Sequence, residues 1–348
     1  RPFPGSLALR AGLGSAQLCA TIMHMSRHAL SGMGAGALSA LLYLTVQWPS
    51  PGALILAYLS PLLLYLVGFS LGATAVLIAM LTGTLVAFLS GSWLDALAYA
   101  VLNAAPAALL VHLSLMSRTS PDGQTTVWYP PGQLLTWLAT GASLLFMAVL
   151  AWTSQNEGGL WYGLESFMQS MVQTFAAAGN KAPTVQLQDA VAKMSSLLPA
   201  MVGVSWMTMH VVNGLLALGL AIRFGWNLRP AADIAHLQVP KSLFYALAIA
   251  LASAFLSDMM GLMARTIAIY LLYPYIFAGL GIVHLGARLV KARVALLLIF
   301  YLLLFILGWP LILVAGLGMI DQWAGLRRRI SGLRSHPENG QDNGQEKE

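Results

Sequence analysis

The chain has 348 residues, of which 58% are hydrophobic and only 9% are charged, and its formal net charge at pH 7 is +6. Soluble domains carry roughly 25% charged residues, so this composition excludes an ordinary soluble protein and indicates a polytopic membrane protein. The single cysteine, Cys19, excludes an intrachain disulfide and a cysteine-based metal cluster.

Residues 1–28 are basic, and we expect them to form a cytoplasmic N-terminal segment. Five apolar stretches follow, at about 29–47, 53–69, 72–91, 94–116 and 133–153, and together they are predicted as a first group of helices over 29–153. Each approaches the roughly 20 residues that cross a ~30 Å hydrocarbon core. They are too long and too evenly apolar for barrel strands, so transmembrane helices are predicted.

Residues 154–197 have a different pattern. Apolar residues recur there at helical spacing between glutamines and a glutamate, as at Leu160, Leu164, Phe167, Met168, Met171 and Phe175. This pattern predicts an amphipathic helix that lies at the membrane surface or covers the bundle. We therefore interpret 154–197 as an external amphipathic insert.

Further spans are predicted at about 198–222, 242–257 and 266–287, with Asp258 and Arg265 in the connector between the last two. Basic residues surround these spans, including Arg229 in the loop before residue 242 and the triplet 327–329. Because the basic segments fall on one side when the spans are counted, both termini are predicted to be cytoplasmic. The basic residues stand at helix ends, so they do not point to nucleic acid as a partner.

The uncharged run 294–320 would make a straight helix about 40 Å long, which exceeds the hydrocarbon core. The sequence "GWP" at 308–310 predicts a break, and thus a hairpin of two short helices at about 294–307 and 310–323. Asp321 then marks where the chain leaves hydrocarbon, Trp323 lies at the interface, and the arginines hold the chain in the cytoplasm. A single tilted helix with an external tail is the alternative.

The predicted fold class is therefore an all-α polytopic transmembrane bundle of about ten membrane segments. The C-terminal transmembrane helices occupy 198–323. Residues 324–348 form a tail that is basic at first and then polar and disordered.

Three stretches resemble a known family. They are "GMIDQW" followed by "LRRR", "LSPLLLYLVGFSLG" at 59–72, and "YPYIFAGLGIVHLGARL" at 273–289. Together they resemble the YybS-like family of uncharacterised bacterial membrane proteins, whose core is similar to the substrate-binding subunits of energy-coupling factor transporters. The resemblance implies binding of a small solute and docking onto a membrane coupling subunit driven by ATPases. The additional C-terminal spans and the 154–197 insert depart from that pattern.

Small residues recur every four positions in two spans, and such faces let helices approach closely in lipid. They are Gly32, Gly36 and Ala40 in the first span, and Ala75, Ala79, Gly83, Ala87 and Gly91 in the third. One interpretation is packing inside the bundle. The other is a docking face for a partner subunit, which the resemblance favours for the first span.

Polar and aromatic residues inside spans are the candidate ligand-binding residues, because each polar group is costly in lipid. They are Asp95, Tyr99 and Asn103 on one helical face, Trp206, His210 and Asn213 on a second, and Tyr273 and Tyr275 on a third. They are predicted to line a solute pocket. In the alternative, the amides and imidazole hydrogen-bond one another between helices, and Asp95 is merely interfacial.

Signals for catalysis are weak. His24 and His28 have the i, i+4 spacing of metal ligands, but no carboxylate neighbours them. The sequence contains no H-E-x-x-H, no G-x-S-x-G and no P-loop, so we expect no enzyme activity and no cofactor, and any ATP hydrolysis must come from another protein. The predicted function is a small-solute-binding subunit of a transport system. The alternatives are a non-transporting membrane scaffold or assembly factor and, third, an intramembrane enzyme.

Overall fold

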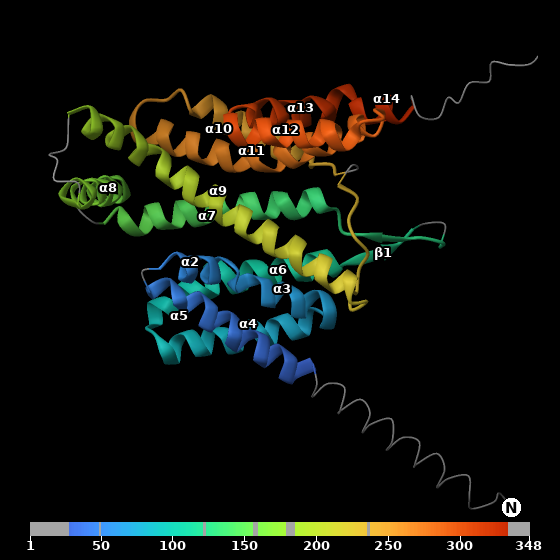
Figure 1. Cartoon of the computed structure of the whole chain (residues 1–348), viewed down its shortest axis with the longest axis horizontal. Coiled ribbons are helices and arrows are strands. Elements are labelled where there is room, and N and C mark those ends of the chain that lie inside the picture. Colours follow the sequence, from blue (N-terminus) through green and yellow to red (C-terminus); the bar gives the residue numbers. More distant parts are fainter. Residues whose placement is uncertain are drawn as a thin grey trace, which may run out of the picture. The chain divides into compact units, whose positions relative to one another are not determined.

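The computed structural model describes residues 28–48, 50–120, 123–155, 159–178, 185–234 and 237–332 (Figure 1). The predictions for His24, for the rest of the N-terminal segment and for most of the C-terminal tail lie outside these residues. Within them, nearly all regular structure is helical, which confirms the all-α prediction. The described strands are β1 (Ser117–Thr119) and β2 (Thr126–Trp128), which pair antiparallel with Arg118 opposite Val127.

The helices follow one another closely along the chain. The first covers His28–Gln47 and ends in the 3-10 turn η1 (Thr45–Gln47). The others are α2 (Pro51–Tyr58), α3 (Ser60–Leu71), α4 (Ala73–Ser90), α5 (Trp93–Tyr99), the π-helical turn η2 (Ala100–Ala104), α6 (Ala105–Leu115), α7 (Pro131–Thr153), α8 (Gly159–Ala178), α9 (Val185–Arg223), α10 (Lys241–Ser253), α11 (Asp258–Ala287), α12 (Arg293–Leu307), α13 (Pro310–Ala324) and α14 (Leu326–Gly332).

Seven helical segments of the described chain are long and apolar enough to cross a membrane. They are His28–Gln47, Pro51–Leu71, Ala73–Ser90, Trp93–Leu115, Pro131–Thr153, Ser195–Arg223 and Met259–Ala287. Helix α10 is apolar but has only 13 residues. With α12 and α13 these helices account for the ten apolar segments that the sequence predicts, although three of the ten are too short to count as spans by themselves.

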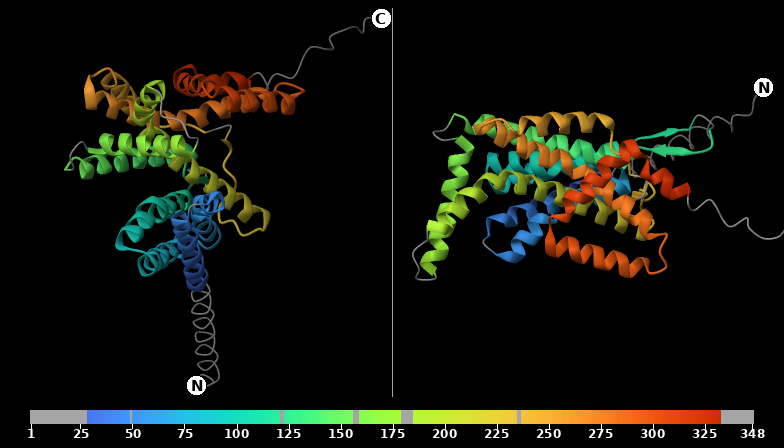
Figure 2. Two further views of the ribbon diagram at one scale, coloured as in Figure 1. Left: turned by 60° about the vertical axis from the view of Figure 1, so that its left-hand side comes forward. Right: turned by 90° about the horizontal axis from the view of Figure 1, so that it is seen from above.

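The predicted break at 308–310 is confirmed. The chain bends by 120° between α12 and α13, and the two helices form a V that can be followed in the right-hand view of Figure 2. Gly308 makes the turn with a φ of 66°, a value that side-chain-bearing residues rarely adopt. Pro310 begins α13, where its missing N–H costs nothing. The single tilted helix is therefore wrong.

Two helix boundaries between α10 and α11 differ from the prediction. Residues 258–265 are not a connector, because α11 begins at Asp258 rather than near residue 266. Helix α10 correspondingly ends at Ser253, before the predicted 257. The predicted boundary was placed where charged residues interrupt the apolar sequence. This prediction failed because the Arg265 side chain is exposed, so the residue can belong to an otherwise apolar helix.

By their contacts the residues fall into two units. The first contains the chain up to Tyr129 together with Thr208–Ala231, and the second contains Pro130–Met207 together with the chain from Ala232 onward. Helix α9 contributes to both. The division of the chain into segments that end at residues 153 and 197, drawn from the sequence, remains a prediction. By its contacts, α7 belongs to the second unit.

The core of the first unit is built on small residues at helix crossings. Gly32 leaves room for the Ala75 carbonyl oxygen, which would lie 2.7 Å from a Cβ at position 32. A Cβ at Gly36 would collide with the Ala79 backbone, and Gly83 leaves space for the Gly36 carbonyl oxygen and the Tyr99 ring. The first helix and α4 therefore pack backbone to backbone.

In the second unit, α11 is the central helix and packs against α7, α10 and α13. Gly279 of α11 and Gly318 of α13 lie at the α11–α13 crossing, where a Cβ on either would collide with the backbone of the other helix. Gly132 gives the same close approach between α7 and the backbone at Gln238. The second unit is thus held together by the same device as the first.

Candidate functional site

A buried polar centre lies in the first unit, around an irregular turn of the span Trp93–Leu115. Pro106 has no N–H, so the carbonyl oxygen of Leu102, four residues earlier, lacks its usual helical donor. The π-helical turn Ala100–Ala104 stands at this place. His210 of α9 supplies the missing donor, with its Nε2 2.9 Å from the Leu102 oxygen.

This contact assigns the tautomer of His210. A carbonyl oxygen can only accept, so Nε2 carries the proton, and in the neutral ring Nδ1 is an acceptor. The Tyr65 hydroxyl lies 3.0 Å from Nδ1 and donates to it. The imidazole is 1% exposed and links α3, η2 and α9. His210 thus donates to a carbonyl oxygen for which the proline provides no N–H.

Asn213, one turn further along α9, has a similar role. Its Nδ2 donates to the carbonyl oxygens of Met209 and Tyr58, each at 2.8 Å. The Tyr58 oxygen is available because the N–H of Leu62 bonds to Leu59 instead, at the junction of α2 and α3. The Oδ1 of Asn213 is buried and has no hydrogen-bond partner among the described residues.

A second chain of hydrogen bonds joins four side chains of the first unit. The Tyr99 hydroxyl donates to Ser39 Oγ at 3.0 Å, and Ser39 Oγ donates to the Ser60 carbonyl oxygen at 2.7 Å. Ser60 Oγ donates to Asn103 Oδ1 over a longer 3.4 Å. All four residues are buried. The sequence analysis did not single out Ser39 and Ser60. The feature that could have revealed them is a hydroxyl group inside an apolar span.

The other candidate ligand residues lie elsewhere. Asp95 is partly exposed in a capping box at the start of α5, where its Oδ2 accepts from Ser92 N and Oγ at 2.8 Å each. Trp206, Tyr273 and Tyr275 belong to the second unit. Tyr275 OH accepts a 3.4 Å hydrogen bond from Gln322. The structure thus gathers Tyr99, Asn103, His210 and Asn213, and the binding role of all eight residues remains a prediction.

The predicted docking residues take part in packing within the chain. Gly32, Gly36 and Ala40 are buried, and the two glycines contact α4. Ala79, Gly83 and Ala87 are buried on α4 itself. The interpretation as internal helix packing therefore describes these contacts, while docking onto a partner subunit remains a prediction.

The segment after α13 is tied back onto the second unit. Asp321 Oδ2 lies 2.9 Å from Arg327 Nε, and its Oδ1 accepts from the Arg327 N–H at 3.0 Å. Arg327 Nη2 donates to the Ala278 carbonyl oxygen at 2.7 Å. Burial lowers the pKa of Arg327, while the Asp321 carboxylate acts to raise it. Gln322 donates to the Val239 oxygen at 3.0 Å, and Trp323 packs edge-on against Phe244.

Two of the arginines predicted as topology signals are therefore buried. Arg327 is one, and Arg229 is the other, with Nη1 donating to the Ser114 carbonyl oxygen at 2.8 Å and the guanidinium over the Trp128 ring. Burial lowers the pKa of Arg229. Arg328 and Arg329, by contrast, are exposed.

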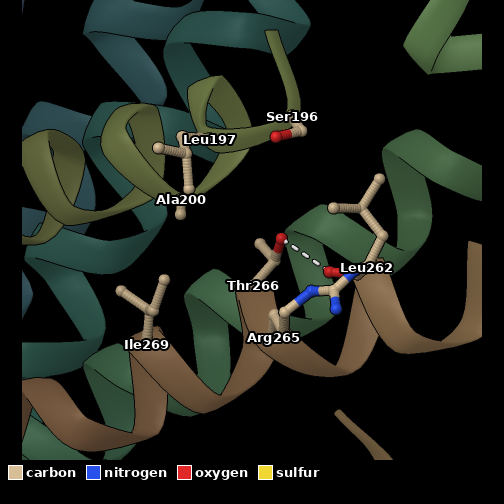
Figure 3. A pocket seen from close by; sticks show the side chains of 7 residues that line it. All are labelled: Ser196, Leu197, Ala200, Leu262, Arg265, Thr266 and Ile269. Carbon is tan, nitrogen blue, oxygen red and sulfur yellow. Dashed lines mark hydrogen bonds between the residues drawn. The ribbon is translucent and has the colours of Figure 1, made fainter. Parts of the chain in front are cut away.

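A pocket of about 440 Å³ lies in the second unit between α9 and α11 (Figure 3). Its lining residues are Ser196, Leu197, Ala200, Leu262, Arg265, Thr266 and Ile269. Thr266 Oγ1 donates to the Leu262 carbonyl oxygen at 3.1 Å, and Arg265 Nη1 lies 3.4 Å from the Ala254 carbonyl oxygen. Sequence reasoning missed this site because it assigned Arg265 to a connector.

The fold and the apolar spans define the class, which is a polytopic helical membrane protein in contact with the lipid bilayer. Within that class, the chain belongs to the family of predicted membrane proteins DUF2232, whose sequence model matches residues 37–322. No curated protein and no solved structure matches the chain. The YybS-like name and the similarity to energy-coupling factor subunits go beyond this match and remain predictions.

Proposed function

We propose that this membrane protein binds a small amphiphilic solute between its helices, as a binding subunit that relies on other proteins for energy. The observation that carries the proposal is the pocket between α9 and α11. Its volume of about 440 Å³ falls within the roughly 300–1,000 Å³ of small-molecule sites. Its lining combines apolar side chains with hydroxyls and one guanidinium, which is the mixture expected for an amphiphilic ligand.

The proposal is binding rather than catalysis. Among the described residues, the pocket lining contains no carboxylate, imidazole or thiol, the side chains that most often act as general bases or nucleophiles. The Thr266 hydroxyl donates to a backbone oxygen of its own helix, and no base lines the pocket to activate it. What the lining supports is therefore recognition of a ligand.

The setting of the proposal is a bacterial inner (cytoplasmic) membrane, which the family resemblance implies. Both termini are cytoplasmic, as the distribution of basic residues predicts. A transport role would require a membrane coupling subunit and ATPases as partners, because the sequence contains no P-loop.

The test is purification from native membranes in mild detergent, followed by mass spectrometry of the bound small molecules and proteins. The pocket variant is Ser196→Leu, which narrows the cavity. Its matched control is Ser205→Leu, the same change at an exposed position nine residues further along α9. We expect one class of solute to be enriched with the wild type and the control and lost from the pocket variant. Equal solute content in all three proteins would refute the proposal.

The polar centre of the first unit favours a second candidate, a non-transporting membrane scaffold. There Tyr99, Asn103, His210 and Asn213 hydrogen-bond within the chain and tie helices to one another. A scaffold would co-purify with other membrane proteins in stable proportion and without an enriched solute. The same mass spectrometry therefore separates the two candidates.

A further inference from the structure

Arg265 has an unusual place for a charged residue. It is the eighth residue of α11, roughly 10 Å along the helix from Asp258, inside the apolar span Met259–Ala287. A charged side chain in a membrane span is costly and usually marks a functional site. Figure 3 shows the side chain lying along α11 beside Leu262 and Thr266, on the far side of the pocket from Ser196.

The protein itself provides few hydrogen-bond acceptors for the Arg265 guanidinium. A guanidinium has five N–H donors. The contact of Arg265 within the described residues is a weak one, 3.4 Å from Nη1 to the neutral Ala254 carbonyl oxygen, and no described carboxylate forms an ion pair with it. By contrast, Arg327 has a carboxylate at 2.9 Å and a carbonyl oxygen at 2.7 Å. Arg265 thus has most of its donors available for a ligand, whereas Arg327 is already paired with a carboxylate.

From this contrast we infer that the pocket between α9 and α11 binds the phosphate group of an anionic membrane lipid, with Arg265 as its counter-ion. The inference rests on the proposed function and names the class of its ligand. A planar guanidinium binds phosphate oxygens through two parallel hydrogen bonds, which suits it to this group. Because no described carboxylate neutralises the positive charge of Arg265, an anionic ligand is favoured at this position in a membrane protein.

The rest of the lining suits the acyl part of such a lipid. Leu197, Ala200, Leu262 and Ile269 are apolar, and Leu197 and Ile269 are 54% and 37% exposed. In a membrane span, exposed apolar side chains face lipid, so the pocket adjoins the bilayer. A lipid can place its headgroup on Arg265 while its chains remain along the helices.

The experiment measures thermal unfolding of the purified full chain in nonionic detergent with three added probes. They are a short-chain phosphatidylglycerol, the matching diacylglycerol without phosphate, and inorganic phosphate. The variants are Arg265→Gln, the charge-conserving Arg265→Lys, and Arg223→Gln as the control at an exposed arginine at the end of α9.

We expect phosphatidylglycerol to stabilise the wild type and Arg223→Gln, with the diacylglycerol giving a much smaller shift. In Arg265→Gln the apparent affinity for phosphatidylglycerol should fall roughly 10- to 100-fold, the loss expected for a charged hydrogen bond, and Arg265→Lys should recover part of it. Ser196→Leu should also weaken the lipid effect without changing the charge, so the inference stays testable if Arg265→Gln does not fold.

The remaining outcomes overturn the inference in distinguishable ways. If inorganic phosphate alone stabilises the protein through Arg265, the site takes a free anion and the lipid assignment is wrong. If diacylglycerol and phosphatidylglycerol stabilise the wild type and Arg265→Gln equally, the anionic class is wrong while the proposed binding function stands. If none of the three probes stabilises the wild type, the lipid assignment is overturned, and the purification test decides the proposed function separately.

Discussion

At the scale of single residues, the buried polar side chains of the first unit compensate for irregular backbone. His210 donates to the Leu102 carbonyl oxygen, for which Pro106 provides no N–H, and Asn213 donates to the Tyr58 oxygen at a helix junction. A buried backbone group without a partner costs several kcal/mol in hydrocarbon, so these contacts have a stabilising role whatever else the residues do.

Loss of the His210 contacts should therefore destabilise the protein. We expect His210→Ala to lower the free energy of unfolding by roughly 1–3 kcal/mol, because it removes the buried hydrogen bonds of the imidazole to the Leu102 carbonyl oxygen and to Tyr65. Tyr65→Phe should cost less, and the two effects should be non-additive because the side chains are in contact at 3.0 Å. The measurement is a double-mutant cycle of thermal unfolding in detergent. Additive effects would show that the two side chains do not interact as described.

The ion pair after α13 gives a second prediction at this scale. Asp321→Asn removes the charge that faces the buried Arg327 guanidinium and should destabilise the chain by roughly 3 kcal/mol. Arg328→Gln, at the exposed neighbour, should change stability by less than about 0.5 kcal/mol. Unfolding curves of the two variants in the same detergent check this. Equal stability of both variants would mean that the pair adds nothing to the docking of this segment.

At the scale of elements, helix contacts in both units depend on small residues. The first helix contains a matched pair for testing this. A Cβ at Gly36 would collide with the Ala79 backbone, whereas nothing lies within 4 Å of a Cβ at Gly34. The close approach of the first helix to α4 therefore depends on one of two neighbouring glycines.

Gly36→Leu should force the first helix away from α4 and cause misfolding or a loss of several kcal/mol of stability, as overpacked cores do. Gly34→Leu should be nearly neutral, because nothing lies within 4 Å of a Cβ at that position. It is a matched control, because it makes the same change in the same helix. Expression level and size-exclusion profile in detergent compare the two. If Gly36→Leu instead folds normally but loses a co-purifying protein, the predicted docking role of this face gains support over internal packing.

The pattern of helices was largely predictable, and its errors have physical causes. Apolar length and the Gly-Trp-Pro sequence predicted the α12–α13 hairpin because a glycine at positive φ followed by proline interrupts any helix. The start of α11 was missed because a charge was taken to end a span. Ser39 and Ser60 were missed because their partners lie 21 or more residues away in sequence, which no local pattern reveals.

At the scale of the whole molecule, the remaining structural prediction is the orientation in the membrane. A reporter fused after Arg334 should be cytoplasmic, and one inserted near Asn180 should be external, because most basic residues flank the spans on one side. Enzymatic reporters that are active on only one side of the membrane measure this. An external signal after Arg334 would invert the C-terminal part of the proposed topology.

The sequence by itself determined the class of this protein, because a low charge content and runs of about 20 apolar residues leave a helical membrane bundle as the stable solution. It also singled out Asn103, His210 and Asn213, which are buried, because lipid penalises a polar group inside a span. Only the tertiary structure decided what those residues contact. The partners of His210 and Asn213 are backbone oxygens of distant helices, and the pocket at Arg265 exists only where α9 and α11 come together. Such contacts depend on how helices cross, and the crossing is set by packing over the whole unit rather than by any local pattern.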